Sequence, residues 1–175
     1  PDTISLHKYL KILKKNKIEN VIIEASSHGL DQERLHHINF KTAIFTNFSQ
    51  DHLDYHKNMK SYLNAKLILF KKILKKNSNI VIDQDINEFS VLKNIGNRRK
   101  LKIIEISETI EKIKKLYLST SSEFKTKNLA MAFIAAKLSG LKDNSLLKSF
   151  EKIKDVDGRF ELVRTFPNNI KVFID

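Results

Sequence analysis

The chain has 175 residues, of which 41% are hydrophobic and 30% are charged, so its composition is that of a globular protein and not of a disordered or collagenous one. A chain of this length buries roughly 70% of its unfolded surface, which is enough for one domain with a real core. It contains no cysteine, which excludes disulfides, thiolate metal sites and cysteine nucleophiles. No apolar run approaches the ~20 residues that span a bilayer, and no signal-peptide pattern opens the chain, so we expect a cytoplasmic protein.

The net charge of +12 allows two interpretations. A basic balance is typical of proteins that bind nucleic acid or anionic small molecules. However, the lysines are spread along the whole chain, and clusters such as Arg98-Arg99-Lys100 lack interleaved aromatic side chains. We therefore favour solvated surface charges and keep a nucleic-acid-binding module as the alternative.

Short apolar runs alternate with amphipathic stretches, which predicts strands that alternate with helices. The predicted helices cover residues 5–15, 59–74, 88–94, 108–115, 128–138 and 144–153. The predicted strands cover residues 21–24, 42–45, 80–82, 101–106, 160–164 and 170–174, the last two joined by a turn at 167–169. Gly140 is expected to end the helix before it. This order implies an α/β fold with a mostly parallel, doubly wound sheet and flanking helices.

Glu24 is the first candidate for a functional side chain because it closes the predicted strand at 21–24. In open α/β sheets the carboxyl ends of the strands line the ligand crevice. A carboxylate there suits Mg²⁺, a hard cation that takes oxygen ligands and often lies beside phosphates. The alternative is that Glu24 caps the N-terminus of a following helix.

A second polar cluster follows the predicted strand at 42–45. Asp51, His52, Asp54 and His56 place four titratable side chains within six residues. A histidine beside a carboxylate can ligate a metal ion or transfer a proton. The alternative is a solvated loop in which an aspartate caps a helix that begins at Leu53. If both strands are parallel, this cluster and the preceding carboxylate lie at one edge of the sheet.

The sequence has only four glycines and no GxxxxGK[ST] phosphate loop. It begins with Pro1 and ends in the apolar run at 170–174 without a turn. From these features we expect a piece of a longer protein. Lys66, in the predicted helix at 59–74, is by position alone one of 32 basic residues.

Three blocks of this sequence resemble the central domain of the Mur ligases. The blocks are EASSHGLDQER at 24–34, FTNFSQDHLDYH at 45–56 and YLNAK at 62–66. Their order and spacing are most similar to the UDP-N-acetylmuramoyl-tripeptide synthetases, which add the third residue of the peptidoglycan stem peptide. The resemblance is dense over 20–75 and thinner over 124–175. It implies an incomplete central domain at 1–157, without its phosphate loop, and the beginning of the C-terminal ligase domain at 158–175.

The resemblance implies an ATP-dependent ligase of peptidoglycan synthesis, and so a role in cell-wall biogenesis, cell shape and cell division. ATP phosphorylates a carboxylate of UDP-N-acetylmuramoyl-dipeptide, and the amine of an amino acid attacks the acyl phosphate to form an amide. The implied cofactors are ATP and Mg²⁺. The implied partners are these two substrates, with neither nucleic acid nor membrane, and the protein is expected to be a monomer. The alternative within the superfamily is folylpolyglutamate synthetase or another Mur ligase. The piece alone is expected to be inactive.

The resemblance also implies a metal and catalytic site. Glu24, His52 and Lys66 match Mg²⁺ ligands of the family. Lys66 matches a lysine that CO₂ carbamylates, which turns a cation into an anion. His52 and Lys66 are therefore the implied catalytic residues.

Further matches concern the substrates. Ser26, Gln32 and Arg34 match residues that hold the UDP-muramoyl-dipeptide, and an arginine fork suits a carboxylate or a phosphate. Asn128 matches an asparagine placed near the adenine, and Arg159 is expected to approach the nucleotide.

The sequence departs from the family pattern in three places. Lys125 stands where the family has an asparagine, and Gln50 stands where a basic residue is common. The stretch at 80–127 is shorter than the corresponding stretch of the family.

Overall fold

A computed structural model describes residues 2–116, 123–150, 152–153 and 161–174. The chain divides into two compact units, Pro1–Gly140 and Leu141–Asp175. The domain boundary predicted after residue 157 lies outside the described residues and stays a prediction. None of the described helices is long and apolar enough to cross a membrane.

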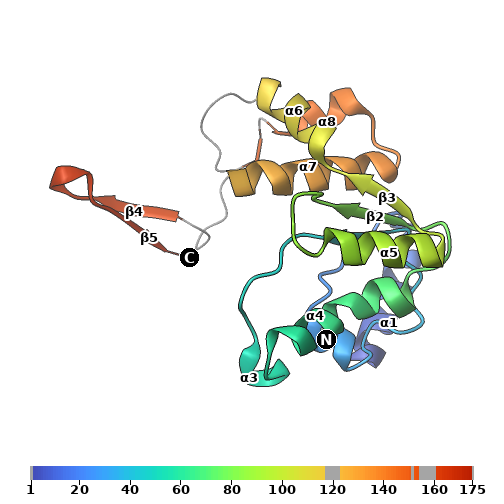
Figure 1. The fold of residues 1–175 in the computed structure, drawn as a ribbon. Coiled ribbons are helices and arrows are strands. Elements are labelled where there is room, and N and C mark those ends of the chain that lie inside the picture. The colour runs from blue at the N-terminus through green and yellow to red at the C-terminus, as the bar shows by residue number, and fades with distance from the viewer. Residues whose placement is uncertain (1, 117–122, 151, 154–160, 175) are drawn as a thin grey trace. The chain divides into compact units, whose positions relative to one another are not determined.

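The first unit is built around a parallel sheet of three strands in the order β1-β2-β3, with helices packed around it (Figure 1). The strands are β1 (Thr42–Phe45), β2 (Asn79–Ile82) and β3 (Lys102–Glu105). The helices are α1 (Thr3–Lys15), α2 (Ser27–Asp31), α3 (Leu53–His56), α4 (Met59–Ile68), α5 (Phe89–Arg99), α6 (Ser107–Leu116) and α7 (Glu123–Leu138), and a π-helical turn η1 (Leu69–Ile73) continues α4. The predicted α/β fold with a parallel sheet and flanking helices is confirmed.

Strand β2 is buried on both faces, and its side chains alternate between two layers of helices. Ile80 and Ile82 belong to a core cluster with Leu67 of α4 and Leu92 of α5. Successive side chains of a strand point to opposite faces, so Val81 faces the other layer, where α7 packs against β1 and β2. Figure 1 shows α7 on one side of the sheet and α4 and α5 on the other. The sheet is therefore the middle layer of three.

One predicted strand is wrong. Residues 18–26 form neither helix nor strand, and the Ile22 side chain is 99% exposed. The prediction rested on three apolar residues, a run too short for its period to distinguish strand from coil. A strand also needs a hydrogen-bonded partner, and among the described strands β1 pairs with β2 alone. Glu24 therefore lies in the loop before α2 and does not close a strand.

The other predicted elements of the first unit are confirmed with shifted ends. The helix predicted at 59–74 is α4 followed by η1, and the helix predicted to begin at 128 begins at Glu123. Gly140, with φ of +97°, follows the end of α7 at Leu138 as predicted. Helix α3 begins at Leu53, as the alternative interpretation of the second polar cluster predicts, although His52 and not an aspartate is its N-cap. Helix α2 follows Glu24, but its N-cap is Ser26. The bounds of both helices were not predicted, because these helices are too short to show a helical period.

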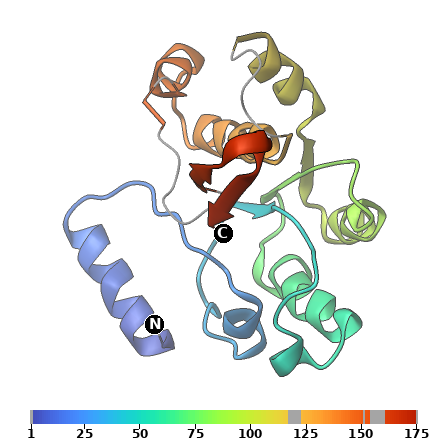
Figure 2. The ribbon, with the colours of Figure 1, turned by 90° about the vertical axis from the view of Figure 1, so that its left-hand side faces the viewer.

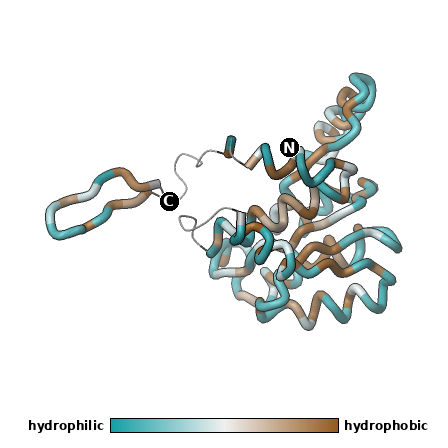
Figure 3. The backbone as a smooth tube through the Cα atoms, turned by 90° about the horizontal axis from the view of Figure 1, so that it is seen from above, coloured by the Kyte–Doolittle hydropathy of each residue, from teal (hydrophilic) through white to brown (hydrophobic). Residues whose placement is uncertain are grey.

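The second unit contains α8 (Asp143–Phe150) and an antiparallel hairpin of β4 (Glu161–Thr165) and β5 (Lys171–Ile174). A 3₁₀ turn, η2 (Pro167–Asn169), joins the two strands, which confirms the predicted turn. Leu162 pairs with Phe173, and the register shifts between Leu162 and Arg164. Figure 3 shows hydrophobic and hydrophilic residues following one another along this hairpin.

An ion pair joins α7 to the end of β2. Nζ of Lys127 lies 2.9 Å from Oδ2 of Asp83 and 3.0 Å from Oε1 of Glu123. The Asp83 side chain is 2% exposed, and it also accepts a hydrogen bond of 3.0 Å from the backbone N–H of Asp85. The hydrogen bonds to Asp83 and then to Glu123 raise the pKa of Lys127 above its ordinary value. Lys127 therefore stays charged at neutral pH.

We predict that Lys127→Met lowers the free energy of unfolding by about 2 kcal/mol, because it leaves the buried Asp83 carboxylate without its cation. The loss stays below the roughly 3–5 kcal/mol of a fully buried pair because Lys127 is partly exposed. Lys72→Met, at an exposed position of η1, is the control and should change the value by less than about 0.5 kcal/mol. Urea unfolding at pH 7 measures both, and equal losses would contradict the prediction.

Candidate functional site

Two predicted substrate residues cap the two ends of helix α2. Oγ of Ser26 accepts a hydrogen bond of 3.1 Å from the backbone N–H of Gly29, which makes Ser26 the N-cap. Gln32 is the C-cap. A helix of five residues is not stable by itself, so its position depends on packing against α4. Figure 2 shows α2 beside α4 beneath the sheet.

The loop after β1 turns at His52. This residue has φ of +54°, in the left-handed region that few residues other than glycine adopt. Oδ1 of Asp51 accepts a hydrogen bond of 2.8 Å from the backbone N–H of His52 and lies 3.4 Å from its Nδ1. The side chain of Asp51 thus supports the turn that starts α3, and His52 itself makes no side-chain cap.

A cluster of aromatic and imidazole rings joins α2, α3 and α4. The ring of His28 lies 4.9 Å from the ring of His52 and 4.2 Å from that of Tyr55. Tyr62 lies 5.9 Å from His52 and is stacked on His56 at 5.3 Å. Burial, and then the charge of His28, lower the pKa of His56, so its imidazole is neutral at pH 7. The ring contacts place the segments at 26–34 and 51–56 side by side.

Lys66 lies at the margin of this cluster and is half-buried. Its Nζ is 5.2 Å from the centroid of the Tyr62 ring and 6.0 Å from that of the Phe45 ring. Burial lowers the pKa of Lys66, while the carboxylates of Asp51 and Glu24 act in the opposite direction. Lys66 is therefore within electrostatic reach of both carboxylates, and its neutral amine, the form that reacts with CO₂, is favoured by burial.

The predicted metal and nucleotide residues fall into three groups. His52 and Lys66 both lie beside the Tyr62 ring, and Glu24 is within electrostatic reach of Lys66. Asn128 lies on α7, across the sheet from α4 (Figure 1). Arg159 lies outside the described residues. The roles assigned to all of these residues stay predictions.

The predicted substrate residues include a hydrogen-bonded chain that the sequence did not reveal. The Tyr55 hydroxyl donates to Oδ2 of Asp31 at 3.1 Å and accepts from Nε2 of Gln32 at 3.3 Å. Oε1 of Gln32 in turn accepts a hydrogen bond from Nη2 of Arg34. In the sequence, the only signal for Tyr55 was its place in the block at 45–56 that resembles the Mur ligases. The guanidinium of Arg34 is a donor group suited to a carboxylate or a phosphate.

The side chains around Lys66 give an incomplete set of ligands for Mg²⁺. Within the part of the chain that the structure describes, no three or more His, Asp or Glu residues are grouped to hold a metal ion. Glu24 and Asp51 supply carboxylate oxygens near Lys66, and His52 supplies an imidazole. Mg²⁺ prefers oxygen ligands. A carbamate on Lys66 would add oxygen donors, so these residues fit Mg²⁺ only with Lys66 in that anionic form.

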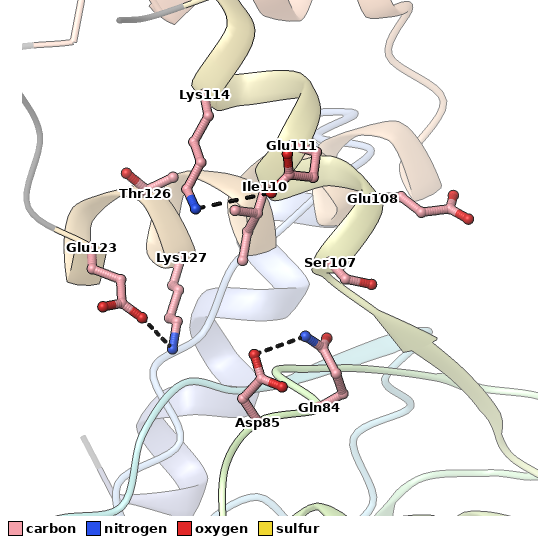
Figure 4. A pocket seen from close by; sticks show the side chains of 10 residues that line it. All are labelled: Gln84, Asp85, Ser107, Glu108, Ile110, Glu111, Lys114, Glu123, Thr126 and Lys127. Atoms are coloured by element: carbon pink, nitrogen blue, oxygen red, sulfur yellow. Dashed lines mark hydrogen bonds and ion pairs between the residues drawn. The ribbon is translucent and has the colours of Figure 1, made fainter. Parts of the chain in front are cut away.

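A separate cavity of about 350 Å³ lies where α6 and α7 meet the ends of β2 and β3 (Figure 4). Its ionisable lining side chains are Asp85, Glu108, Glu111, Glu123, Lys114 and Lys127. Four carboxylates against two lysines disfavour a phosphate and favour an amine or an uncharged base. Three of its lining residues come from α7, the helix that also carries Asn128, but neither Asn128 nor Lys66 lines the cavity.

We predict that Lys66 titrates below the ordinary lysine value of 10.5, because burial disfavours its ammonium form. Trace acetylation between about pH 7 and pH 11, followed by mass spectrometry, measures this. The pH at which the labelling rate of Lys66 is half-maximal is compared with the same pH for Lys60, which is exposed on the same helix. The pH midpoint is compared, and not the labelling rate itself, because burial also slows access of the reagent. A midpoint for Lys66 at or above that of Lys60 would contradict the prediction.

Comparison with known proteins identifies relatives along the whole chain. A ligase of Rickettsia montanensis named UDP-N-acetylmuramoyl-L-alanyl-D-glutamate--2,6-diaminopimelate ligase is 32% identical over 195 residues, which cover 99% of this chain and 40% of that protein. A ligase of the same name from Rhizobium meliloti is 28% identical, over 100% of this chain and 40% of the relative. Another from Clostridium botulinum is 43% identical, over 56% of this chain and 20% of the relative.

The chain spans about 40% of the length of the curated relatives that it matches along its whole length. The Rickettsia alignment is longer than the 175-residue chain, so that relative carries residues which this chain lacks. The family of the Mur ligase middle domain matches residues 1–145. The chain therefore belongs to the Mur ligase middle domain family.

Proposed function

We propose that the protein containing this chain is an ATP-dependent ligase that adds the third amino acid to UDP-N-acetylmuramoyl-dipeptide in peptidoglycan synthesis. The observation that carries the proposal is the position of Lys66 in a chain of the Mur ligase family: it lies beside the Tyr62 ring that His52 also contacts, and within electrostatic reach of Glu24. The names of the relatives make 2,6-diaminopimelate our first candidate for the added amino acid. They favour this ligase over folylpolyglutamate synthetase and over a nucleic-acid-binding module.

The proposed reaction has two steps. A carboxylate of the dipeptide attacks the γ-phosphorus of ATP, which forms an acyl phosphate and releases ADP. The amine of the amino acid then attacks the acyl carbon, phosphate leaves, and the amine loses a proton as the amide forms. The first step brings a carboxylate against a triphosphate, so the site must neutralise negative charge. Mg²⁺ supplies this neutralisation when it is bound, and Glu24, His52 and carbamylated Lys66 would hold it.

Carbamylation is the step in which Lys66 becomes a metal ligand. The neutral amine attacks the carbon of CO₂, one N–H proton leaves, and the product is an anionic carbamate. The lowered pKa of Lys66 supports this role because it increases the fraction of neutral amine. Asp51 and Glu24 near the same nitrogen make a bound cation necessary if the carbamate is to persist.

The substrate contacts extend the proposal along α2 and α7. Ser26, Gln32 and Arg34 hold the UDP-muramoyl-dipeptide, with the guanidinium of Arg34 on a carboxylate or a phosphate. Asn128 lies near the adenine, and Arg159 approaches the nucleotide. The ligase acts as a cytoplasmic monomer, and cell shape and division depend on its product.

We predict that Lys66→Ala in the full-length protein lowers the ligation rate by about 100-fold or more, since even residues that only support metal ligands contribute about 10- to 100-fold. Bicarbonate should not rescue this variant, and Lys66→Glu, which restores an anion on a shorter stem, should recover some activity. Lys60→Ala on the same helix is the control. Release of phosphate that depends on the dipeptide substrate measures the rate. If Lys66→Ala formed the amide at close to the wild-type rate, Lys66 would not be part of the proposed metal site.

We predict further that the 175-residue chain alone does not hydrolyse ATP at an enzymatic rate. Its sequence contains no phosphate loop, whose backbone N–H groups cradle phosphates. A coupled ADP-release assay on the purified chain measures this. Turnover in the usual range of roughly 1 to 1,000 per second would contradict the prediction.

A further inference from the structure

Two consecutive side chains of α3 hold α2 at both of its ends. Nε2 of His56 lies 2.9 Å from Oγ of Ser27, the first residue of α2. The Tyr55 hydroxyl bonds to Asp31, the last residue of α2, and to Gln32 just beyond it. Because α2 has only five residues, these contacts and its packing on α4 fix its place.

The bond at the start of α2 is sheltered from water. The side chains of His56 and Ser27 are both buried, at 6% and 2% exposure. His56 is also stacked on Tyr62 of α4. Water cannot replace a hydrogen bond in such a place, so this end of α2 is held firmly. The other end, at Tyr55, is more exposed and lies next to the predicted substrate residues.

The bonds at Tyr55 have a fixed direction. The Tyr55 hydroxyl donates its one proton to Oδ2 of Asp31. The hydroxyl oxygen is then free to accept from the amide nitrogen of Gln32. This turns the amide oxygen of Gln32 toward Arg34, whose guanidinium has only donors. The opposite amide orientation would set two donors against each other.

We propose that Tyr55 is a positioning residue for the substrate-binding side chains, because it orients Gln32 and through it holds the guanidinium of Arg34 in place before the anionic UDP-muramoyl-dipeptide binds. This inference rests on the proposed function, which makes Arg34 a contact of that substrate. Holding a side chain in its bound conformation reduces the entropy lost on binding. Tyr55 therefore acts on the binding of this one substrate and not on the chemical steps.

Tyr55→Phe in the full-length ligase removes the hydroxyl and keeps the ring. It should raise the KM for UDP-muramoyl-dipeptide up to about tenfold, the effect of losing the one hydrogen bond that holds Gln32 and, through it, Arg34. The kcat and the KM for ATP should stay within about twofold, which a general loss of structure would not allow. Tyr9→Phe, on an exposed tyrosine of α1, is the matched control. A lowered kcat with an unchanged KM for the dipeptide would overturn the proposal.

A double-mutant cycle tests the path through Gln32. If Tyr55 acts through this amide, Tyr55→Phe should change the KM by less than about twofold in a Gln32→Ala background. A full tenfold effect of Tyr55→Phe in that background would show that the hydroxyl acts by another path, and the proposed relay would be wrong.

The position of Arg34 gives a result that needs no ligase activity. In crystal structures of the full-length protein, the Arg34 guanidinium should leave its wild-type position in Tyr55→Phe and keep it in Tyr9→Phe. An unchanged Arg34 in Tyr55→Phe would overturn the relay even in an active enzyme. A wild-type protein that forms no amide would instead overturn the proposed function, and the structural comparison would still decide the relay.

Discussion

Strand β2 has helices on both of its faces, and the placement of the predicted site depends on this double burial. Ile80 and Ile82 pack toward α4 and α5, so α4 must present an apolar face to the sheet. Leu67 of α4, together with Phe70 of the η1 turn that continues it, provides that face. Lys66 precedes Leu67 on the helix and therefore lies at the edge of the buried surface, where its ammonium is partly shielded from water. The lowered pKa of Lys66 is thus a consequence of how the sheet is covered.

The predicted substrate residues Ser26 and Gln32 cap α2, and the predicted metal ligand His52 is the N-cap of α3. Neither of these short helices is stable by itself. Ring contacts hold them against α4, with His28 between His52 and Tyr55. Polar bonds from Tyr55 and His56 reach both ends of α2. A site built in this way is accurate only while its supports are intact. Residues that touch no substrate can therefore control how well the substrate is bound.

Charge separates two regions of the first unit. Around Lys66, one half-buried amine lies within reach of the carboxylates of Asp51 and Glu24, an arrangement suited to a cation and a carbamate. The cavity between α6 and α7 has four carboxylates and two lysines, and Lys127 is already paired with Asp83. This cavity suits an uncharged base better than phosphates.

The sequence by itself determined the long elements and the motif blocks. The runs that became β1, β2 and β3 were recognisable from their consecutive apolar residues. Helices α4 and α7 were recognisable because long amphipathic or alanine-rich stretches have few alternatives. Tertiary structure decided the rest. Residues 21–23 are apolar yet form no strand, since a strand forms only with a hydrogen-bonded neighbour. Lys66 was one lysine among many until the packing of α4 half-buried it. Tyr55 and Gln32 are 23 residues apart, and only the meeting of α2 and α3 joins them, because a side-chain hydrogen bond depends on position in space and not on distance along the chain.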